Sequence, residues 1–213
     1  MAGRFDAFYA LEEDKKQRIL DAALEEFGEK PYKNASTNAI ANKAQIGKGM
    51  LFYYFGSKLE LFHFLCEYVL EFFRREYLDK FNCESKDFLE RQLQLAELKN
   101  HMLEDNSKQI TFFENFYMPE NEQYLEPYAE QVHAYRSEVF GKLYNDVDES
   151  LFKEGIDPKH AMKYMTWILQ EYAAEVEERW TTGTNRVKDK EAMDAEWKEF
   201  YIFMEDMRKL FYK

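Results

Sequence analysis

The sequence contains few of the glycine and proline residues that form the tight turns of β-structure. It also contains few of the cysteines that cross-link small extracellular folds. It contains eight Gly and four Pro in 213 residues, too few for the many tight turns of an all-β protein. Its two cysteines, Cys66 and Cys83, form no CxxC pair or zinc-ligand pattern and cannot build a disulfide framework. These shortages favour long helices and a reducing compartment, so we expect an all-α, cytoplasmic protein.

Long hydrophobic runs are also missing. The most apolar stretch, residues 59–73, is interrupted by Glu60, Glu67 and Glu71, which rules it out as a membrane span. Residues 1–16 lack the apolar core of a signal peptide. We therefore expect no membrane partner.

An excess of positive charge is absent as well, although the charge is unevenly spread. The formal net charge is −12, yet residues 14–60 hold eight Lys and Arg against six Asp and Glu. Residues 61–213 hold 20 Lys and Arg against 32 Asp and Glu. Because a nucleic acid responds to the local field, this division permits a DNA-binding site within residues 14–60 without requiring one.

Apolar periodicity and capping residues predict nine helices. Asp14 begins a capping box with Gln17, and Ser57 begins a second with Glu60. Ser36 or Thr37 can cap the short helix between them, and Asp157 precedes a proline in the cap-plus-first-turn arrangement. The predicted helices cover about residues 14–29, 37–44, 48–55, 58–80, 87–106, 109–118, 127–153, 158–180 and 189–213. We expect two domains, an N-terminal three-helix domain over residues 1–56 and a C-terminal helical domain over residues 57–213.

The stretch STNAIANKAQIGKGMLFYYFGSK, residues 36–58, has the pattern of a helix-turn-helix. Ala41 and Ala44 allow two short helices to approach closely, and Gly47 allows a sharp turn between them and can cap the second helix. Leu51 and Phe55 suit the core. The alternative is an ordinary pair of short helices within a bundle, with its Tyr and Phe residues buried.

The residues of this stretch that suit contact with DNA have small polar, basic, aromatic or apolar side chains, and one of them is a glycine. Lysine pairs with phosphate or guanine, hydroxyls and helix N-termini contact phosphate, glycine lets the backbone approach, and apolar side chains pack on thymine methyls. The candidate DNA contacts are Ser36, Thr37, Lys48, Gly49, Met50, Phe52, Tyr53, Tyr54 and Lys58.

Residues 14–62 resemble the N-terminal domain of the tetracycline-repressor (TetR) family of bacterial transcription regulators. The matching segments are ILDAALEEF, NASTNAIANKA, IGKGMLFYYF and SKLELF, in that order, over about a quarter of the chain. The resemblance implies a dimeric regulator that binds a near-palindromic operator in double-stranded DNA. We expect this regulator to be a repressor. It places the family's DNA-contacting positions on Ser36, Thr37, Lys48, Gly49, Tyr53, Tyr54 and Lys58.

Three residues depart from the family pattern and put the operator sequence in doubt. Gly47 stands where Ser is frequent, Phe52 where Tyr is common, and Tyr54 where His is frequent. Each change alters a contact without removing the helical scaffold.

The resemblance also implies a C-terminal domain that senses a small-molecule effector. Aromatic residues are dense in this part of the chain, which would suit an aromatic or lipophilic ligand, although such residues more often simply form the core. The candidate pocket residues are Tyr68, Phe72, Phe113, Phe116, Tyr117, Tyr128 and Tyr135.

The last two predicted helices each carry a wide apolar face that suits pairing with a second copy as a homodimer. The alternative is that these faces pack only within one chain. The candidate interface residues are Met165, Ile168, Trp197, Tyr201 and Met204.

Two Glu-x-x-His pairs offer an alternative function. Glu60/His63 and Glu130/His133 have the spacing used in helical di-iron sites, so a metalloenzyme is one alternative and a protein-binding helical adaptor is another. No phosphate-binding loop, nucleophile elbow or zinc cluster is present in the sequence. We therefore expect no enzymatic activity, no metal and no cofactor.

Overall fold

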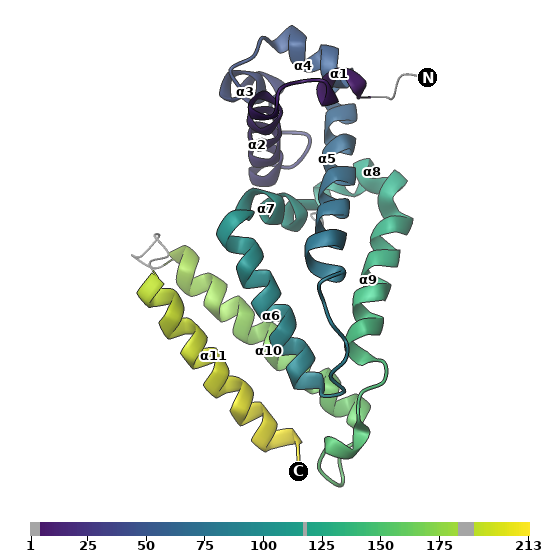
Figure 1. The fold of residues 1–213 in the computed structure, drawn as a ribbon, viewed down its shortest axis with the longest axis vertical. Coiled ribbons are helices and arrows are strands. Elements are labelled where there is room, and N and C mark those ends of the chain that lie inside the picture. The colour runs from purple at the N-terminus through teal and green to yellow at the C-terminus, as the bar shows by residue number, and fades with distance from the viewer. Residues whose placement is uncertain (1–4, 117–118, 183–189) are drawn as a thin grey trace. The chain divides into compact units, whose positions relative to one another are not determined.

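The structure is a computed structural model that describes the backbone of residues 5–116, 119–182 and 190–213, and their side chains except at residues 103–105, 177, 180–182 and 190. Within these ranges the regular structure is helical, with no strand and one isolated bridge between Phe152 and Tyr212 (Figure 1). The α-helices are α1 (Asp6–Tyr9), α2 (Glu13–Glu29), α3 (Thr37–Lys43), α4 (Lys48–Phe55), α5 (Lys58–Phe73), α6 (Phe88–Asp105), α7 (Ser107–Phe116), α8 (Glu122–Leu125), α9 (Ala129–Tyr144), α10 (Pro158–Thr182) and α11 (Lys190–Phe211). The all-α prediction is confirmed.

The nine predicted helices correspond to α2–α7 and α9–α11. The four-residue helices α1 and α8 were not predicted, and neither were the short 3-10 turns. The 3-10 turns lie at Pro119–Asn121, Glu126–Tyr128 and Glu149–Leu151, and a π turn follows α5 at Arg74–Leu78. Met118 and the predicted cap Asp189 lie outside the described residues.

Most predicted caps are present. The Ser36 and Ser57 hydroxyls accept hydrogen bonds from the backbone N–H groups of Ala39 (3.3 Å) and Glu60 (3.1 Å). The Asp157 carboxylate accepts from the N–H of Lys159 at 2.8 Å. The cap predicted at Asp14 is wrong, because α2 begins one residue earlier and places Asp14 inside its first turn.

Two helices end earlier than predicted. The α-helical part of α5 stops at Phe73 and continues as the π turn. Helix α9 stops at Tyr144 rather than near residue 153. The buried guanidinium of Arg91 donates to two of its last carbonyl groups and to that of Asn145 just beyond it, and Asp146 turns the chain with φ +58°.

The chain divides into two compact units, and unit 1 comprises residues 1–81 and 96–139. Its α2, α3, α4 and α5 pack around buried Leu24, Ile40 and Leu65. We call residues 5–62 of this unit the head. Helix α7 lies close against the end of α2, since a Cβ added to Gly28 would stand 3.1 Å from the backbone nitrogen of Phe112.

Unit 2 comprises residues 82–95 and 140–213. Helices α10 and α11 run antiparallel, with the rings of Tyr172 and Phe203 stacked 4.4 Å apart. The start of α6 is tied to the end of α11 because the Asp87 carboxylate accepts from the Arg208 guanidinium (2.6 Å) and the Tyr212 hydroxyl (2.8 Å). Burial and this carboxylate raise the pKa of Tyr212 above its ordinary value.

None of the described helices combines the length and the low polarity that a membrane span needs. The predicted division into residues 1–56 and 57–213 concerns function, and it stays a prediction.

Candidate nucleic-acid interface

Helices α3 and α4 form the predicted pair of short helices joined by a tight turn. Ala41 and Ala44 are buried where the two helices approach. The left-handed residue of the turn is Gln45, with φ +56°, whereas Gly47 has φ −68°, which any residue adopts. Gly47 is the N-cap residue of α4, as predicted, and the left-handed position of the turn falls on Gln45 instead.

Helix α4 divides into a buried and an exposed side. Leu51 and Phe55 are buried, as predicted, and the ring of Tyr53 is 69% exposed. Lys48 and Gly49 at the N-terminus are also exposed, and a Cβ added at Gly49 would meet no heavy atom within 4 Å. The exposed side therefore presents a cation, bare backbone and a phenol hydroxyl to the solvent.

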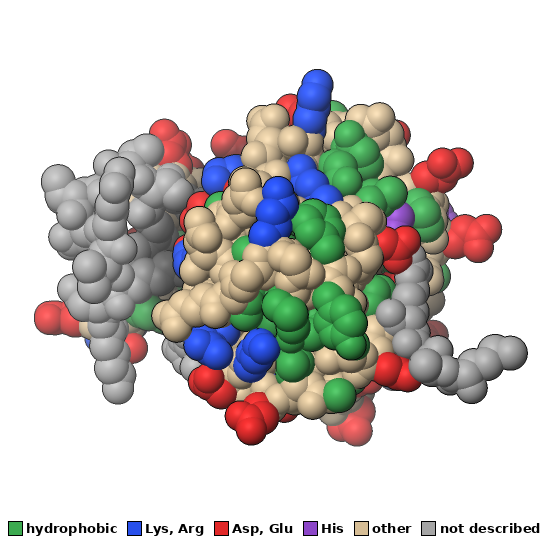
Figure 2. Space-filling view, turned by 90° about the horizontal axis from the view of Figure 1, so that it is seen from above, with side chains coloured by type: hydrophobic (Ala, Val, Ile, Leu, Met, Phe, Trp, Pro, Cys, Tyr) green, Lys and Arg blue, Asp and Glu red, His purple; other side chains and the backbone are tan. Residues whose placement is uncertain are grey.

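The exposed apolar residues of α4 complete this surface. The Met50 side chain is exposed, and the half-buried Phe52 has the Lys48 ammonium 5.9 Å from its ring centre. Figure 2 looks down on this end of unit 1 and shows Lys and Arg side chains beside exposed hydrophobic ones. Such a mixture suits phosphate contacts together with contacts to thymine methyl groups.

Tyr54 is the candidate DNA contact that the structure places in the core. Its side chain is 3% exposed, and its hydroxyl accepts a hydrogen bond from the Lys15 ammonium at 3.1 Å. The cause is helical spacing, since Tyr54 follows the buried Leu51 by three residues and shares its side of the helix. We therefore omit Tyr54 from the contacts proposed below.

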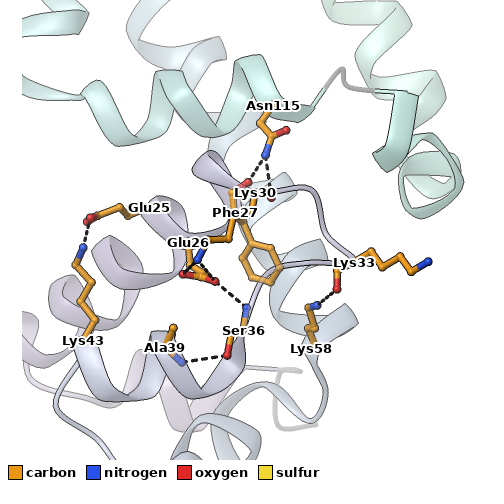
Figure 3. Close-up of polar contacts among 10 residues, drawn as sticks. All are labelled: Glu25, Glu26, Phe27, Lys30, Lys33, Ser36, Ala39, Lys43, Lys58 and Asn115. Atoms are coloured by element: carbon orange, nitrogen blue, oxygen red, sulfur yellow. Dashed lines mark hydrogen bonds and ion pairs between the residues drawn. The ribbon is translucent and has the colours of Figure 1, made fainter.

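The N-terminus of α3 is held to α2 by a buried carboxylate. Glu26 accepts from the backbone N–H of Ser36 at 2.8 Å and from the Lys30 ammonium at 2.9 Å (Figure 3). The Ser36 hydroxyl meanwhile caps α3, and Thr37 next to it is half-buried. Ser36 is thus fixed in place at a helix N-terminus, where amide groups favour an anion.

Lys58 is held inside the head. Its ammonium donates to the backbone carbonyl of Lys33 at 3.3 Å (Figure 3). The same ammonium lies 4.5 Å from the centre of the Tyr32 ring. Burial lowers the pKa of Lys58 from its ordinary value. A phosphate contact by Lys58 would therefore compete with these two internal contacts.

Two buried asparagines connect this head to α7 and were not predicted. The Asn115 side-chain amide donates to the carbonyls of Phe27 (2.5 Å) and Lys30 (3.0 Å) at the end of α2 (Figure 3). Asn121 accepts from the N–H of Tyr32 at 2.8 Å and donates to the carbonyl of Asn115 at 2.8 Å. The sequence carries no sign of this role, because the partners are 85–89 residues apart.

The candidate pocket residues lie mainly in the core of unit 1. Phe113 stacks on Phe73 with ring centres 4.1 Å apart and lies 6.0 Å from the ring of Tyr135. The Tyr128 hydroxyl donates to Glu67 at 3.0 Å. Phe72, Phe116, Tyr128 and Tyr135 are buried, Tyr68 and Phe113 are half-buried, and Tyr117 lies outside the described residues.

Two surface hollows lie among the described residues of unit 2, and neither is lined by these aromatic residues. One, of about 520 Å³, is lined by Cys83, Glu84, Lys86, Arg91, Gly141, Lys142, Asn145 and Asp146. The other, of about 190 Å³, lies between α6 and α11 and is lined by Leu89, Glu90, Leu93, Tyr201, Met204, Glu205 and Arg208.

The candidate dimer residues divide between core and surface. Met165 and Met204 are buried in unit 2, Trp197 is half-buried, and Ile168 and Tyr201 are exposed. The sequence reasoning missed other exposed apolar residues of α10 and α11, which are Tyr164, Trp167, Ile202 and Leu210.

The two Glu-x-x-His pairs do not come together in a metal site. Among the described residues, no group of three or more His, Cys, Asp or Glu side chains is placed to hold a metal ion. The His63 ring instead makes a 3.0 Å hydrogen bond with the carbonyl of Tyr124.

The helix-turn-helix segment matches a known family. Residues 19–65 match the family model described as bacterial regulatory proteins, tetR family. No curated protein sequence matches the chain.

Solved structures with a similar fold cover nearly the whole chain. A TetR-family regulator from Chloroflexus aurantiacus J-10-FL has 16% identity and a TM-score of 0.67, over 98% of each chain. MexZ, a repressor responsible for antibiotic resistance in Pseudomonas aeruginosa, has 17% identity and a TM-score of 0.60, over 92% of this chain and 96% of its own. The ketosteroid transcriptional regulator KstR2 of Mycobacterium tuberculosis has 18% identity and a TM-score of 0.57, over 95% and 97%. At these identities the likeness concerns the fold.

Proposed function

We propose that this chain, a DNA-binding transcriptional regulator of the tetR family by its N-terminal domain and its fold, reads an operator with α4 and represses transcription until a small effector binds. The observation that carries the proposal is the division of α4 into a buried anchor and an exposed side. MexZ, which has a similar fold, is a repressor, and we extend that role to this chain.

The proposed contacts with the operator come from both short helices. Lys48 pairs with guanine or phosphate, the Tyr53 hydroxyl donates to phosphate, and Met50 packs on a thymine methyl. Gly49 allows the backbone of α4 to approach the duplex. The other proposed contacts are Phe52, Lys58, and Ser36 and Thr37 at the start of α3. The Lys58 ammonium would leave the carbonyl of Lys33 and bind a phosphate instead.

Lys48→Ala is expected to weaken binding to duplex DNA from upstream of the chain's own gene by about 1–3 kcal/mol, because one charged contact at the start of α4 is lost. Fluorescence anisotropy at fixed salt measures the change. Lys99→Ala removes the same charge from an exposed site on α6 and should leave the affinity unaltered. Equal losses in the two variants would contradict the assignment of α4 as the reading helix.

We further propose that two chains pair through α10 and α11, which would present two reading helices to a near-palindromic operator. The support is a set of exposed apolar side chains on these two helices, with Trp167 54% exposed and Ile202 65% exposed. Exposed apolar residues gathered on adjacent helices commonly mark an interface. Of the sequence candidates, Ile168 and Tyr201 belong to this surface, Trp197 borders it, and Met165 and Met204 support it from the core.

Trp167→Glu is expected to raise the dimer dissociation constant by about 30-fold or more, since a buried aromatic anchor contributes about 2 kcal/mol or more. Sedimentation or light scattering across a dilution series measures this constant. Tyr9→Glu makes the same kind of change at another exposed aromatic residue, in unit 1, and should leave it unchanged. A wild-type chain that stays monomeric at micromolar concentration would exclude the dimer.

The proposed effector is a small aromatic or lipophilic molecule that enters the aromatic core of unit 1. Binding there would separate rings such as the stacked Phe73 and Phe113. The neighbouring Asn115 would carry the displacement to the end of α2, because its amide holds two carbonyl groups there. A ligand that favours one arrangement shifts the population of head positions and thereby the operator affinity.

A further inference from the structure

We propose that α1 is a clasp that holds the reading helix α4 in place, with Phe5 and Phe8 as its positioning residues. The inference rests on the proposed function, in which α4 contacts DNA. Helix α1 precedes residues 19–65, so the tetR-family model does not describe it.

The clasp consists of two phenylalanine rings that pack against the end of α4. Phe8 is 1% exposed and Phe5 is also buried, although both lie at the start of the chain. The Phe8 ring lies 5.0 Å from the ring of Phe55, the last residue of α4, and 5.2 Å from the ring of Phe64 on α5. Phe5 contacts the same two rings at 6.0 Å and 4.9 Å. Aromatic packing of this kind adds to the stabilisation gained from burial.

The backbone of α1 keeps these two rings on one side. Phe5 accepts hydrogen bonds from the N–H groups of Phe8 (2.9 Å) and Tyr9 (3.0 Å), which closes a single helical turn. Residues three apart share one side of such a turn, so Phe5 and Phe8 are both buried against the head. Tyr9 is 61% exposed, and one edge of its ring still lies 6.1 Å from the ring of Phe64.

Helix α4 needs an external support because it is short and weakly capped. It has eight residues, its N-cap Gly47 offers no side-chain hydrogen bond, and it ends at Gly56 with φ +77°. Helices of this length are unstable alone and depend on tertiary packing. In the proposed function the exposed side of α4 contacts DNA. The helix is therefore held to the rest of the head by its buried residues Leu51, Tyr54 and Phe55. The clasp encloses the last of these three anchors.

The consequence is that the clasp sets the fraction of molecules whose α4 is docked and ready to bind DNA. The apparent dissociation constant rises in inverse proportion to that fraction. Loss of the clasp should therefore weaken DNA binding even though neither Phe5 nor Phe8 contacts the duplex.

The test compares Phe8→Ala with Phe140→Ala in the full chain, using duplex DNA from upstream of the chain's own gene and hydrogen exchange of the unbound protein. Phe8→Ala should raise the apparent dissociation constant about tenfold if the docked fraction falls to about one tenth. Exchange of the α4 amides should quicken, while the amides of α2 keep their protection. Phe8→Leu should restore most of both properties. Phe140→Ala, which removes the same ring from a 60% exposed position in unit 2, should change neither.

Three results would overturn the clasp. The first is wild-type DNA affinity in Phe8→Ala, and the second is unchanged exchange of the α4 amides. The third is equal loss of protection in α2 and α4 in the milder Phe8→Leu variant, because Phe8 would then be an ordinary part of the core. A wild-type chain that binds no DNA would refute the proposed function instead, and the exchange measurement would still decide whether α1 holds α4.

Discussion

Asn115→Asp is expected to lower the free energy of unfolding of unit 1 by about 3–5 kcal/mol at pH 7, because it leaves an uncompensated buried charge. Asn115 is 2% exposed, and its amide nitrogen lies 2.5 Å from the carbonyl oxygen of Phe27 and 3.0 Å from that of Lys30. A carboxylate oxygen in that place would face both acceptors. Rotation about the last side-chain bond offers no relief, because the present Oδ1 is buried without a hydrogen-bond partner.

The pH dependence separates this electrostatic effect from a packing defect. Burial raises the pKa of the introduced carboxyl in the folded state above its unfolded value of about 3.9. The destabilisation should therefore grow as the pH rises from about 4, and it should be complete above the folded-state pKa. At pH 4 the variant should lie much closer to the wild type, since a protonated carboxyl can donate to a carbonyl.

Hydrogen exchange of unit 1 amides measures this loss, and Asn34→Asp serves as the control. Asn34 is exposed in the loop between α2 and α3, and its replacement should shift stability by no more than about 0.5 kcal/mol. DNA affinity should fall in Asn115→Asp, because the end of α2 and the loop to α3 lose their tie to α7. A variant as stable as the wild type at pH 7 would show that Asn115 does not fix this contact.

Arg91→Ala is expected to lower the free energy of unfolding of unit 2 by about 3–5 kcal/mol, since a buried charge-assisted network is lost and its acceptors stay behind. The Arg91 guanidinium is buried, and it donates to the carbonyl groups of Cys83, Ser85, Lys142, Leu143 and Asn145. Lys142 and Leu143 lie in the last turn of α9 and Asn145 directly follows it, where the helix dipole also favours a cation. Arg91 therefore joins the segment before α6 to the end of α9.

Tryptophan fluorescence during urea unfolding reports this loss selectively, because Trp167, Trp180 and Trp197 are the three tryptophans of the chain and all belong to unit 2. Arg91→Lys should recover little stability, since one ammonium cannot reach carbonyl groups that a planar guanidinium spans. Lys86→Ala, at an exposed site beside the same segment, should stay within about 0.5 kcal/mol of the wild type. A loss under 1 kcal/mol in Arg91→Ala would contradict the proposed role.

Patterns among residues that are close in the sequence predicted much of the fold. Ser36, Ser57 and Asp157 cap their helices as expected, because a cap is an interaction between residues two or three apart. Interactions between distant residues decided the rest. Helix α9 stops at Tyr144 because of contacts with Arg91, which is more than 50 residues away in the sequence. No pattern in the neighbouring residues indicates this helix end.

Sequence patterns placed most of the candidate DNA contacts at the protein surface, with Tyr54 as the exception. The exposed Lys48 and Tyr53 lie on α4 as expected, whereas Tyr54 turned inward with the apolar side of the same helix. Its hydroxyl favoured a contact with DNA in the sequence reasoning, and Lys15 satisfies that hydroxyl instead. Helix α1 went unpredicted because a single turn has too few residues to show a helical period, although Phe5 and Phe8 have the spacing of one side of a helix.

The most direct test of the central claim is the affinity of the wild-type chain for DNA from upstream of its own gene, measured across a salt series. If α3 and α4 contact phosphates in both halves of an operator, the affinity should fall by about 10³-fold or more between 50 and 200 mM salt, as counterions released by binding require. An affinity that does not respond to salt, or the absence of binding to any duplex, would contradict the account.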